Sequence, residues 1–200
     1  FAPMYLLIQK ENYIGSVKDY ILSRNPYTIV NEIDDEIYIS TNYRVLVENS
    51  LEHLTKYWVK PVVGFHTLRE MFEVIAPISV TREANRHRTL SVLEESTRYV
   101  NYSKDKHGSS IKIIDNSESE EVRKISEEFY EIANQTYMKL IEMGCKAEDA
   151  RKVLPLNTAS KVYYSAFTSH WNHFLSLRNT TSAHHEIREI SKIIESILLC

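Results

Sequence analysis

The chain has 200 residues, enough for one large domain or two small ones, and its 43% hydrophobic and 26% charged residues are ordinary for a globular protein with its own core. Its net charge of −3 gives no reason to expect a nucleic-acid-binding protein, so an anion site would need a local group of arginines. Two cysteines without metal-ligand or disulfide spacing, no apolar run near the ~20 residues of a membrane span and no visible signal peptide predict a cytoplasmic protein with neither a metal site nor a membrane partner.

The first 60 residues are predicted to contain strands and short helices. Met4–Ile8 is a short apolar run typical of a strand, and Val17–Leu22 has helical spacing. From Thr28 to Val47 β-branched and aromatic residues alternate with polar ones, which predicts a hairpin. Ser50 is a suitable N-cap for a helix that ends before Pro61.

The middle of the chain is predicted to be strand-rich. Phe72–Val80 is apolar and β-rich, and Thr81 is expected to cap a short helix after it. Tyr99–Tyr102 and Ile111–Ile114 are read as short strands on either side of a polar loop, Ser103–Ser110.

A long helix is predicted over Ser119–Met143. Apolar residues recur there every three or four positions, and Gly144 is a natural C-terminal stop. Two alternatives remain open for this helix, which is either a core helix or part of a subunit interface.

The remaining elements mix helix and strand. Ala147–Val153 is predicted to be a short helix, Ala159–Thr168 a strand, and His170–Leu177 and Ala183–Leu199 two further helices. The order does not alternate as in βαβ units, so the sequence predicts an α+β fold with one antiparallel or mixed sheet and packed helices.

The most polar part of the chain is the stretch Arg86–Tyr99. It holds three arginines, a histidine, acids and hydroxyls within fourteen positions, without a clean apolar period. This composition indicates a binding site for a multiply charged ligand, because guanidinium groups match phosphate and carbonyl oxygens. A solvated, salt-bridged helix face is the alternative.

Other candidate residues each have a simpler alternative. Arg151 lies before a helix-ending proline, where it can also complement a helix dipole. His170 and His173 have i,i+3 spacing, but no third metal ligand is near, so polar half-buried residues are the favoured interpretation. His66 and Glu70 could contact a cofactor, or be a loop residue and a helix cap.

Arg86-His87-Arg88, followed after seven residues by Ser96 and then by Arg98-Tyr99, resembles the signature of flavin-dependent thymidylate synthases. Similar blocks follow in the order of that family, and they read ESTRYVNYSK at 95–104, ARKVLP at 150–155, WNHFLSLR at 171–178 and AHHEIR at 183–188. The first 65 residues carry no motif that we match to the family.

The resemblance implies a single domain over residues 1–200 with the α+β fold of that family, assembled as a homotetramer. It implies FAD as cofactor and the conversion of dUMP to dTMP, with methylene-tetrahydrofolate as carbon source and NADPH as reductant. The FAD-binding residues that it implies are Thr67, Glu70, Arg86, His87, Arg88 and His173. The dUMP-binding residues that it implies are Glu83, Glu94, Ser96, Thr97, Arg98, Arg178 and, from a neighbouring subunit, Arg151.

The chain departs from the family pattern at several of these positions. Glu83 stands where the family often has glutamine, and Phe167 where some members place a flavin-binding asparagine. In the block before the strand, His66 is one residue too close and Met71 replaces the second histidine. Flavin and folate contacts from this block are therefore open, and a non-catalytic nucleotide- or polyanion-binding relative is the alternative function.

The expected chemistry must make C5 of the uracil ring nucleophilic. A cysteine nucleophile needs an activated thiolate, but Cys145 follows a predicted helix end, where the dipole disfavours a thiolate, and Cys200 is terminal. An arginine against the uracil carbonyl can stabilise the developing charge instead, and Arg178 is the candidate catalytic residue. Ser96 has no adjoining His–Asp relay, so a binding role is preferred for it.

Overall fold

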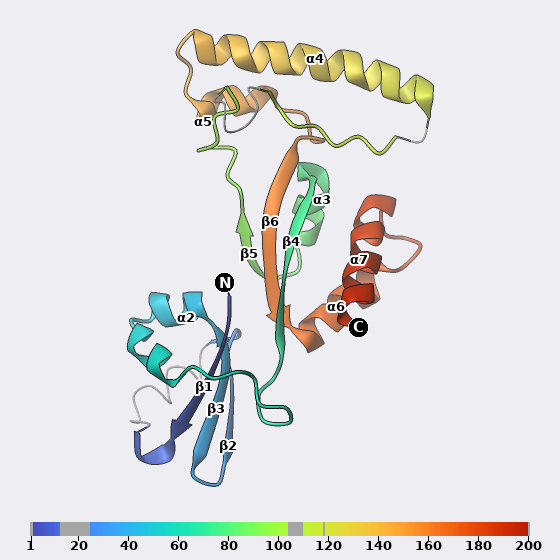
Figure 1. Ribbon diagram of the computed structural model, residues 1–200. Helices are drawn as coiled ribbons and strands as arrows, with labels where there is room; N and C mark the ends of the chain where they lie inside the picture. Colours follow the sequence, from blue (N-terminus) through green and yellow to red (C-terminus); the bar gives the residue numbers. More distant parts are fainter. Residues whose placement is uncertain (1, 13–24, 104–109, 118, 200) are drawn as a thin grey trace. The chain divides into compact units, whose positions relative to one another are not determined.

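A computed structural model describes residues 2–12, 25–103, 110–117 and 119–199 of the chain (Figure 1). Helices and two three-stranded sheets confirm the α+β class, although the sequence predicted one sheet rather than two. The helix predicted at Val17–Leu22 and most of the polar loop Ser103–Ser110 lie outside the described residues. No helix in the described part of the chain is long and apolar enough to cross a membrane.

The chain divides into two compact units, each made of segments that are distant in sequence. The first unit comprises Phe1–Glu73, His87–Leu93 and Tyr163–Cys200, and the second comprises Val74–Arg86 and Glu94–Val162. The Arg86-His87-Arg88 signature therefore crosses a unit boundary, with Arg86 in the second unit and the other two residues in the first.

The sheet of the first unit is antiparallel. Its strands β1 (Pro3–Gln9), β2 (Ile29–Ile33) and β3 (Glu36–Asn42) have the order β1-β3-β2, and a short 3-10 helix, η1 (Lys10–Asn12), follows β1. Alternate side chains of β1 and β3 point to one face, where Leu6, Ile8, Ile37 and Ile39 form a core together with Leu46 and Leu54 from the helical segments that follow β3. The predicted first strand and the predicted hairpin are thus confirmed.

The hairpin is shorter than the sequence predicted, because a helix begins where β3 ends. The helix α2 (Tyr43–Glu48) starts after Asn42, whose side chain accepts a hydrogen bond from a helix N–H. Ser50 is not the N-cap of the next element. Its φ of 57° is left-handed, and the 3-10 helix η2 (Glu52–Tyr57) begins after it.

The second sheet contains β4 (Arg69–Pro77), β5 (Ser91–Glu94) and β6 (Ala159–Phe167), in the order β4-β6-β5. The strand predicted to reach Val80 stops at Pro77, because proline cannot donate to a ladder and suits the position before a helix. The helix α3 (Ile78–Ala84) follows at once, so Thr81 lies within a helix and does not cap one.

The prediction of two short strands, at Tyr99–Tyr102 and Ile111–Ile114, is also wrong, because neither segment forms a continuous strand. The backbone N–H groups of Tyr99 and Val100 both bond to the Ser96 carbonyl, which makes a turn. In the other segment only Ile113 forms an isolated bridge, to Thr158. Ladder pairing depends on distant partners, which local composition does not reveal.

The long helix of the second unit is α4 (Glu120–Glu142). Ser119 caps it by accepting a hydrogen bond from the Val122 N–H, and Gly144 ends it with a φ of 88°, as the sequence predicted. Its buried Tyr137 shares a core with Ala150 of α5 (Ala147–Ala150) and with Val153 of η4 (Arg151–Val153), and α5 lies alongside α4 in Figure 1. Much of the apolar stripe of α4 is nevertheless exposed, including Ile125, Phe129 and Ile132.

The last two helices belong to the first unit and pack against each other. They are α6 (Thr168–Arg178) and α7 (His185–Leu198), and they agree with the two helices predicted there. Trp171 and Phe174 are buried on α6, and the Trp171 Nε1 donates to the Glu70 carbonyl at 3.3 Å. This packing holds the end of α6, where Arg178 lies, against the rest of the unit.

Candidate functional site

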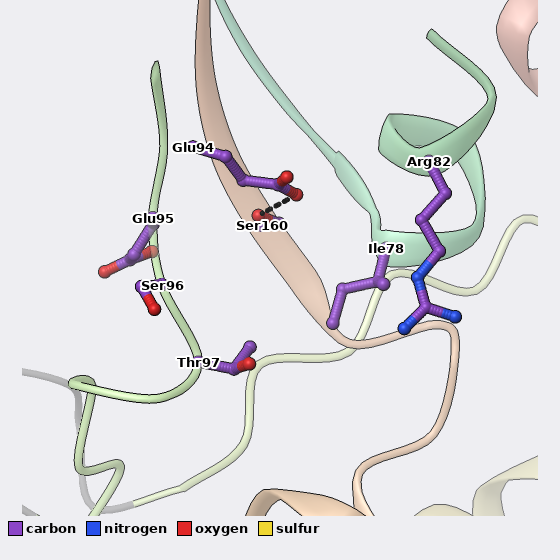
Figure 2. A pocket seen from close by; sticks show the side chains of 7 residues that line it. All are labelled: Ile78, Arg82, Glu94, Glu95, Ser96, Thr97 and Ser160. Carbon is purple, nitrogen blue, oxygen red and sulfur yellow. Dashed lines mark hydrogen bonds between the residues drawn. The ribbon is translucent and has the colours of Figure 1, made fainter. Parts of the chain in front are cut away.

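A polar cavity of about 310 Å³ lies in the second unit, at the end of β5 (Figure 2). Its lining comes from α3, from the chain that leaves β5 and from β6, and consists of Ile78, Arg82, Glu94, Glu95, Ser96, Thr97 and Ser160. The cavity thus contains three of the residues predicted to bind dUMP, namely Glu94, Ser96 and Thr97.

Glu94 is held in place by hydrogen bonds from three side chains. Its Oε1 accepts from the hydroxyls of Thr81 at 2.8 Å and Ser160 at 3.0 Å, and its Oε2 accepts from the Asn85 amide at 2.9 Å. Thr81 and Ser160 are buried. The carboxylate orientation is therefore fixed by α3 and β6 before any ligand arrives.

Arg82 and Ser160 also line the cavity, and neither was predicted from the sequence as a site residue. Arg82 extends from α3 on the same side as Ile78, four residues earlier, as expected for one helix face. Its side chain makes no hydrogen bond or ion pair with any described residue. The i,i+4 spacing of Ile78 and Arg82 places both side chains on one helix face. The sequence could not use this spacing to predict that Arg82 lines the cavity, because the helix α3 was not known to begin at Ile78. Glu83, the next residue, does not line the cavity.

Arg98 lies just past the cavity lining and faces α5. Its Nε donates to Glu148 Oε2 at 2.9 Å, and its guanidinium lies over the Tyr99 ring at 5.3 Å. Arg151 begins η4 three residues after Glu148 and has an exposed side chain that bonds to no described residue. Arg98 therefore contacts the acidic first turn of α5, while Arg151 follows directly after the end of that helix.

In the first unit, His87 and Arg178 contact each other directly. Arg178 Nε donates to His87 Nε2 at 2.8 Å, and the His87 ring packs edge-on against Phe174 at 4.8 Å between centroids. The pKa of His87 is lowered to about 4, mainly by burial and also by the charges of Arg178 and His173. The imidazole is therefore neutral at pH 7, with its proton on Nδ1.

The other residues predicted to bind FAD have mixed surroundings. Arg86 and Arg88 are exposed, and neither side chain bonds to a described residue. His173 is exposed, with its ring 6.4 Å from that of His87. Thr67 is half-buried and its N–H donates to Ser40 Oγ at 2.9 Å. Glu70, half-buried, accepts the bond from Trp171 through its carbonyl oxygen rather than its carboxylate.

His66 is held inside the first unit by both ring nitrogens. Its Nε2 donates to the Leu6 carbonyl at 3.1 Å, and its Nδ1 accepts from the Val62 N–H at 3.0 Å. Burial lowers the pKa of His66, which keeps this ring neutral as well. With both nitrogens used, this histidine is part of the framework and offers no nitrogen to a cofactor.

The remaining candidates do not gather into a catalytic or metal-binding group. In the described ranges there is no cluster of three or more His, Cys, Asp or Glu side chains that could hold a metal ion. His170 is half-buried, and its Nδ1 has no partner among the described residues. Cys145 is a free, exposed thiol just past the end of α4, and Cys200 lies outside the described residues.

Comparison with known proteins identifies relatives for most of the chain. The family model for thymidylate synthase complementing protein matches residues 48–198. A flavin-dependent thymidylate synthase of Thermus thermophilus is 34% identical over 141 residues, which are 64% of this chain and 51% of the relative. One from Tropheryma whipplei is 34% identical over 145 residues, covering 63% and 60%.

A solved structure shares the fold. The UMP/dUMP methylase PolB from Streptomyces cacaoi, bound with 5-Br dUMP, has a TM-score of 0.54 and 27% identity, and the match covers 65% of each chain. This chain spans about half the length of the Thermus relative and 60% of the Tropheryma one. Because the family model covers three quarters of the residues, both candidate sites included, the chain belongs to the thymidylate synthase complementing protein family.

Proposed function

We propose that the protein is a flavin-dependent thymidylate synthase that converts dUMP to dTMP with methylene-tetrahydrofolate and NADPH, without a cysteine nucleophile. The cavity at the end of β5 is the observation that carries this proposal. It contains an oriented carboxylate, hydroxyl groups and an arginine that has no partner among the described residues. Its volume is near the lower end of the range for small-ligand sites. The relatives with matching names and the dUMP-methylase structure support the same reaction.

The nucleotide would bind to the second unit through sugar and phosphate. Glu94 offers carboxylate oxygens to a ribose hydroxyl, while Ser96 and Thr97 offer hydroxyls and the Thr97 N–H. Arg98 and a neighbouring subunit's Arg151 would hold the phosphate in a homotetramer, because guanidinium forks match phosphate oxygens. We add Arg82 to this set because of its position at the cavity, and we give Glu83 only a minor role.

The residues of the signature fit FAD in charge and in hydrogen-bonding capacity. Arg86 and Arg88 are exposed cations without partners among the described residues, which suits the diphosphate of FAD. His87 keeps an Nδ1–H that bonds to no described residue, and His173, Thr67 and Glu70 complete the proposed set. Bound FAD supplies hydride transfer, with NADPH as the source of reducing equivalents.

Arg178 is the proposed catalytic residue. Its positive guanidinium, placed against a uracil carbonyl, would stabilise the negative charge that develops on the ring oxygen when C5 attacks the folate carbon. Cys145 does not suit a nucleophile, because it is an exposed thiol after the end of α4 with no activating partner among the described residues. Charge stabilisation would therefore replace covalent activation.

The alternative is a non-catalytic relative that binds a nucleotide or another polyanion. The internal hydrogen bonds of His66 favour it, because they remove one candidate flavin contact from the block before β4.

Absorbance and product formation distinguish the two functions. The purified protein should take up FAD, show flavin absorbance, and form dTMP from dUMP only when methylene-tetrahydrofolate and NADPH are both present. A protein that binds dUMP but neither FAD nor the folate would be the binding relative. A protein that binds neither dUMP nor FAD would refute both functions.

A further inference from the structure

A second cavity, of about 180 Å³, lies in the first unit. Helix α2, strand β5 and the turn before β2 provide its wall. None of its lining residues belongs to the sets proposed above for dUMP or FAD, so its ligand is a separate question. The lining consists of Tyr27, Asn42, Arg44, Val45, Glu48, Leu90, Ser91 and Val92.

A buried arginine bonds to this wall from the interior of the unit. Arg69 is 1% exposed, and its Nη2 donates to the Oγ of Ser91, a lining residue, at 2.6 Å. Its other side-chain bonds go to Ser165, from Nε to Oγ at 3.0 Å and from Nη2 to the carbonyl oxygen at 2.9 Å. Its Nη1 has no partner among the described residues. All of the acceptors that Arg69 uses are therefore neutral.

The charge of Arg69 is not balanced by any described carboxylate. Burial lowers the pKa of Arg69 to about 10, so the guanidinium still carries its proton at pH 7. The rings of Phe167 and Tyr27, 4.9 Å and 6.0 Å from the guanidinium carbon, offset only part of the cost of burying this charge. A buried cation of this kind is strongly favoured by a nearby anion.

Ser91 connects this charge to the cavity. Its Oγ accepts from Arg69 Nη2 at 2.6 Å and from Asn42 Nδ2 at 3.5 Å. A hydroxyl has two acceptor positions and one proton to donate, and no described residue accepts the proton of Ser91. Because a charged donor polarises the hydroxyl that accepts from it, Ser91 is a strengthened donor for a ligand in the cavity.

Asn42 adds a second donor with a defined orientation. Its Oδ1 accepts from the Val45 N–H at 3.1 Å, so the amide nitrogen is the atom that faces Ser91. An amide nitrogen carries two N–H groups, and only one of them is used in the bond to Ser91. The cavity wall therefore presents two neighbouring donors in front of a positive charge.

The other charges at the cavity largely cancel. Arg44 and Glu48 form an i,i+4 ion pair with each other, and their side chains are 51% and 55% exposed, so solvent screens both of them. Val45 and Leu90 are buried and apolar, which strengthens electrostatic interactions on the inner side of the cavity. The balance of charge on that side is positive because of Arg69.

We propose that this cavity binds a small oxyanion, either phosphate or a carboxylate, through the Ser91 hydroxyl and the Asn42 amide, with Arg69 supplying the compensating charge. The proposal does not depend on thymidylate synthesis, because it uses none of the residues assigned to that reaction.

Titration of the full chain with inorganic phosphate, without nucleotide or flavin and at constant ionic strength, tests the site. The backbone amide NMR signals of Ser91 and Asn42 should shift and saturate, and the melting temperature should rise with the same dissociation constant, because the ligand binds only the folded state. A parallel titration with acetate shows whether a carboxylate binds more tightly than phosphate.

Variants locate the binding. Arg69→Met removes the charge and should weaken phosphate binding at least ~10-fold, as expected for a charged group. Without phosphate this variant should melt at or above the wild-type temperature, because a buried charge without an opposite charge is lost. Ser91→Ala keeps the charge but removes the polarised hydroxyl, and should weaken binding at least ~3-fold.

Two matched controls accompany these variants. Ser165→Ala removes a different hydroxyl that bonds to Arg69 but does not line the cavity, and it should keep the wild-type affinity for phosphate. Arg123→Met removes an exposed arginine of α4 and should also keep it.

The failures are distinguishable. Absence of saturable binding of both phosphate and acetate to the wild-type protein would overturn the proposal. Binding that is unchanged in Arg69→Met, or in Ser91→Ala if Arg69→Met does not fold, would place the anion elsewhere and would overturn it as well. Failure of the wild-type protein to make dTMP would refute the proposed function and leave this site unaffected.

Discussion

Glu148 of α5 accepts a hydrogen bond from Arg98 Nε at 2.9 Å, and Arg98 is one of the arginines that we propose to bind the substrate phosphate. The pair is half exposed, and such pairs contribute only ~0.2–1 kcal/mol. A phosphate, which binds arginine through charge-assisted bonds, can therefore compete for Arg98 at small cost. Glu148 would act as a weak competitor of the nucleotide.

Glu148→Gln is expected to tighten dUMP binding about 2- to 5-fold, because it releases Arg98 from an interaction of up to ~1 kcal/mol. Titration calorimetry on both proteins measures the change. Asp149→Asn is the matched control, since Asp149 lies on the same helix but pairs with Lys152. Weaker dUMP binding in Glu148→Gln would instead mean that Glu148 supports the site.

Arg98→Ala and Arg151→Ala are each expected to weaken dUMP binding by ~1.5–3 kcal/mol, the usual range for hydrogen bonds to charged groups. Binding should become weaker with salt in the wild-type protein and less so in the variants, because a phosphate contact is lost. Arg123→Ala on α4, where Arg123 pairs with Glu120, is the control for removing an exposed arginine. Unchanged affinity in either variant would remove that residue from the site.

Glu94→Gln is expected to lower the stability of the protein by ~1–3 kcal/mol, because an amide group would face donors that now bond to carboxylate oxygens. Urea unfolding measures the loss, and dUMP binding should weaken as well. Glu95→Gln, at the exposed neighbouring position, should leave the stability unchanged. Equal stability of both variants would show that the three bonds to Glu94 matter little.

Local patterns predicted much of the fold, because capping and periodicity act within a few residues. Ser119 and Gly144 mark the ends of α4 in the sequence, and the side chain and backbone conformation agree. The extent of strands was less predictable. Pro77 ends β4 three residues earlier than the apolar run suggested, because an apolar run continues just as well into a half-buried helix.

The site was predictable only where its residues lie in one motif. Glu94, Ser96 and Thr97 reach the cavity together because they lie within four positions at the end of β5 and just after it. Ser160, from another strand, had no local signal. Arg69 is a stronger case, a buried arginine held by Ser91 and Ser165, which are 22 and 96 residues away. Contacts at such separations depend on tertiary packing, which one sequence does not display.

Cys145→Ser is expected to keep full activity, because an exposed thiol after the end of α4 has no activating partner among the residues that the structure describes. Steady-state rates of dTMP formation before and after the substitution measure this. Treatment of the wild-type protein with a thiol reagent gives an independent check, since blocking Cys145 should not abolish turnover. A folded but inactive Cys145→Ser protein would reopen covalent catalysis.

Acid should destabilise the protein in a window set by three histidines whose pKa is lowered in the folded state. Burial is the main cause of a lowered pKa at His66, His87 and His170, so each binds protons more weakly in the folded than in the unfolded state. For His87 the two values are about 4 and the ordinary ~6.5. Between these pH values the unfolded state holds more protons, so stability falls as pH decreases from about 6.5 to about 4 and this contribution levels off below that.

Thermal unfolding at half-unit pH steps between about 7 and about 4 measures this dependence. His87→Gln has no group that titrates in this range at that position, so its melting temperature should fall less steeply than that of the wild-type protein. His185→Gln, at an exposed histidine of α7, is the control and should follow the wild-type curve. If His87→Gln also follows the wild-type curve, then His87 is not held neutral by the folded structure.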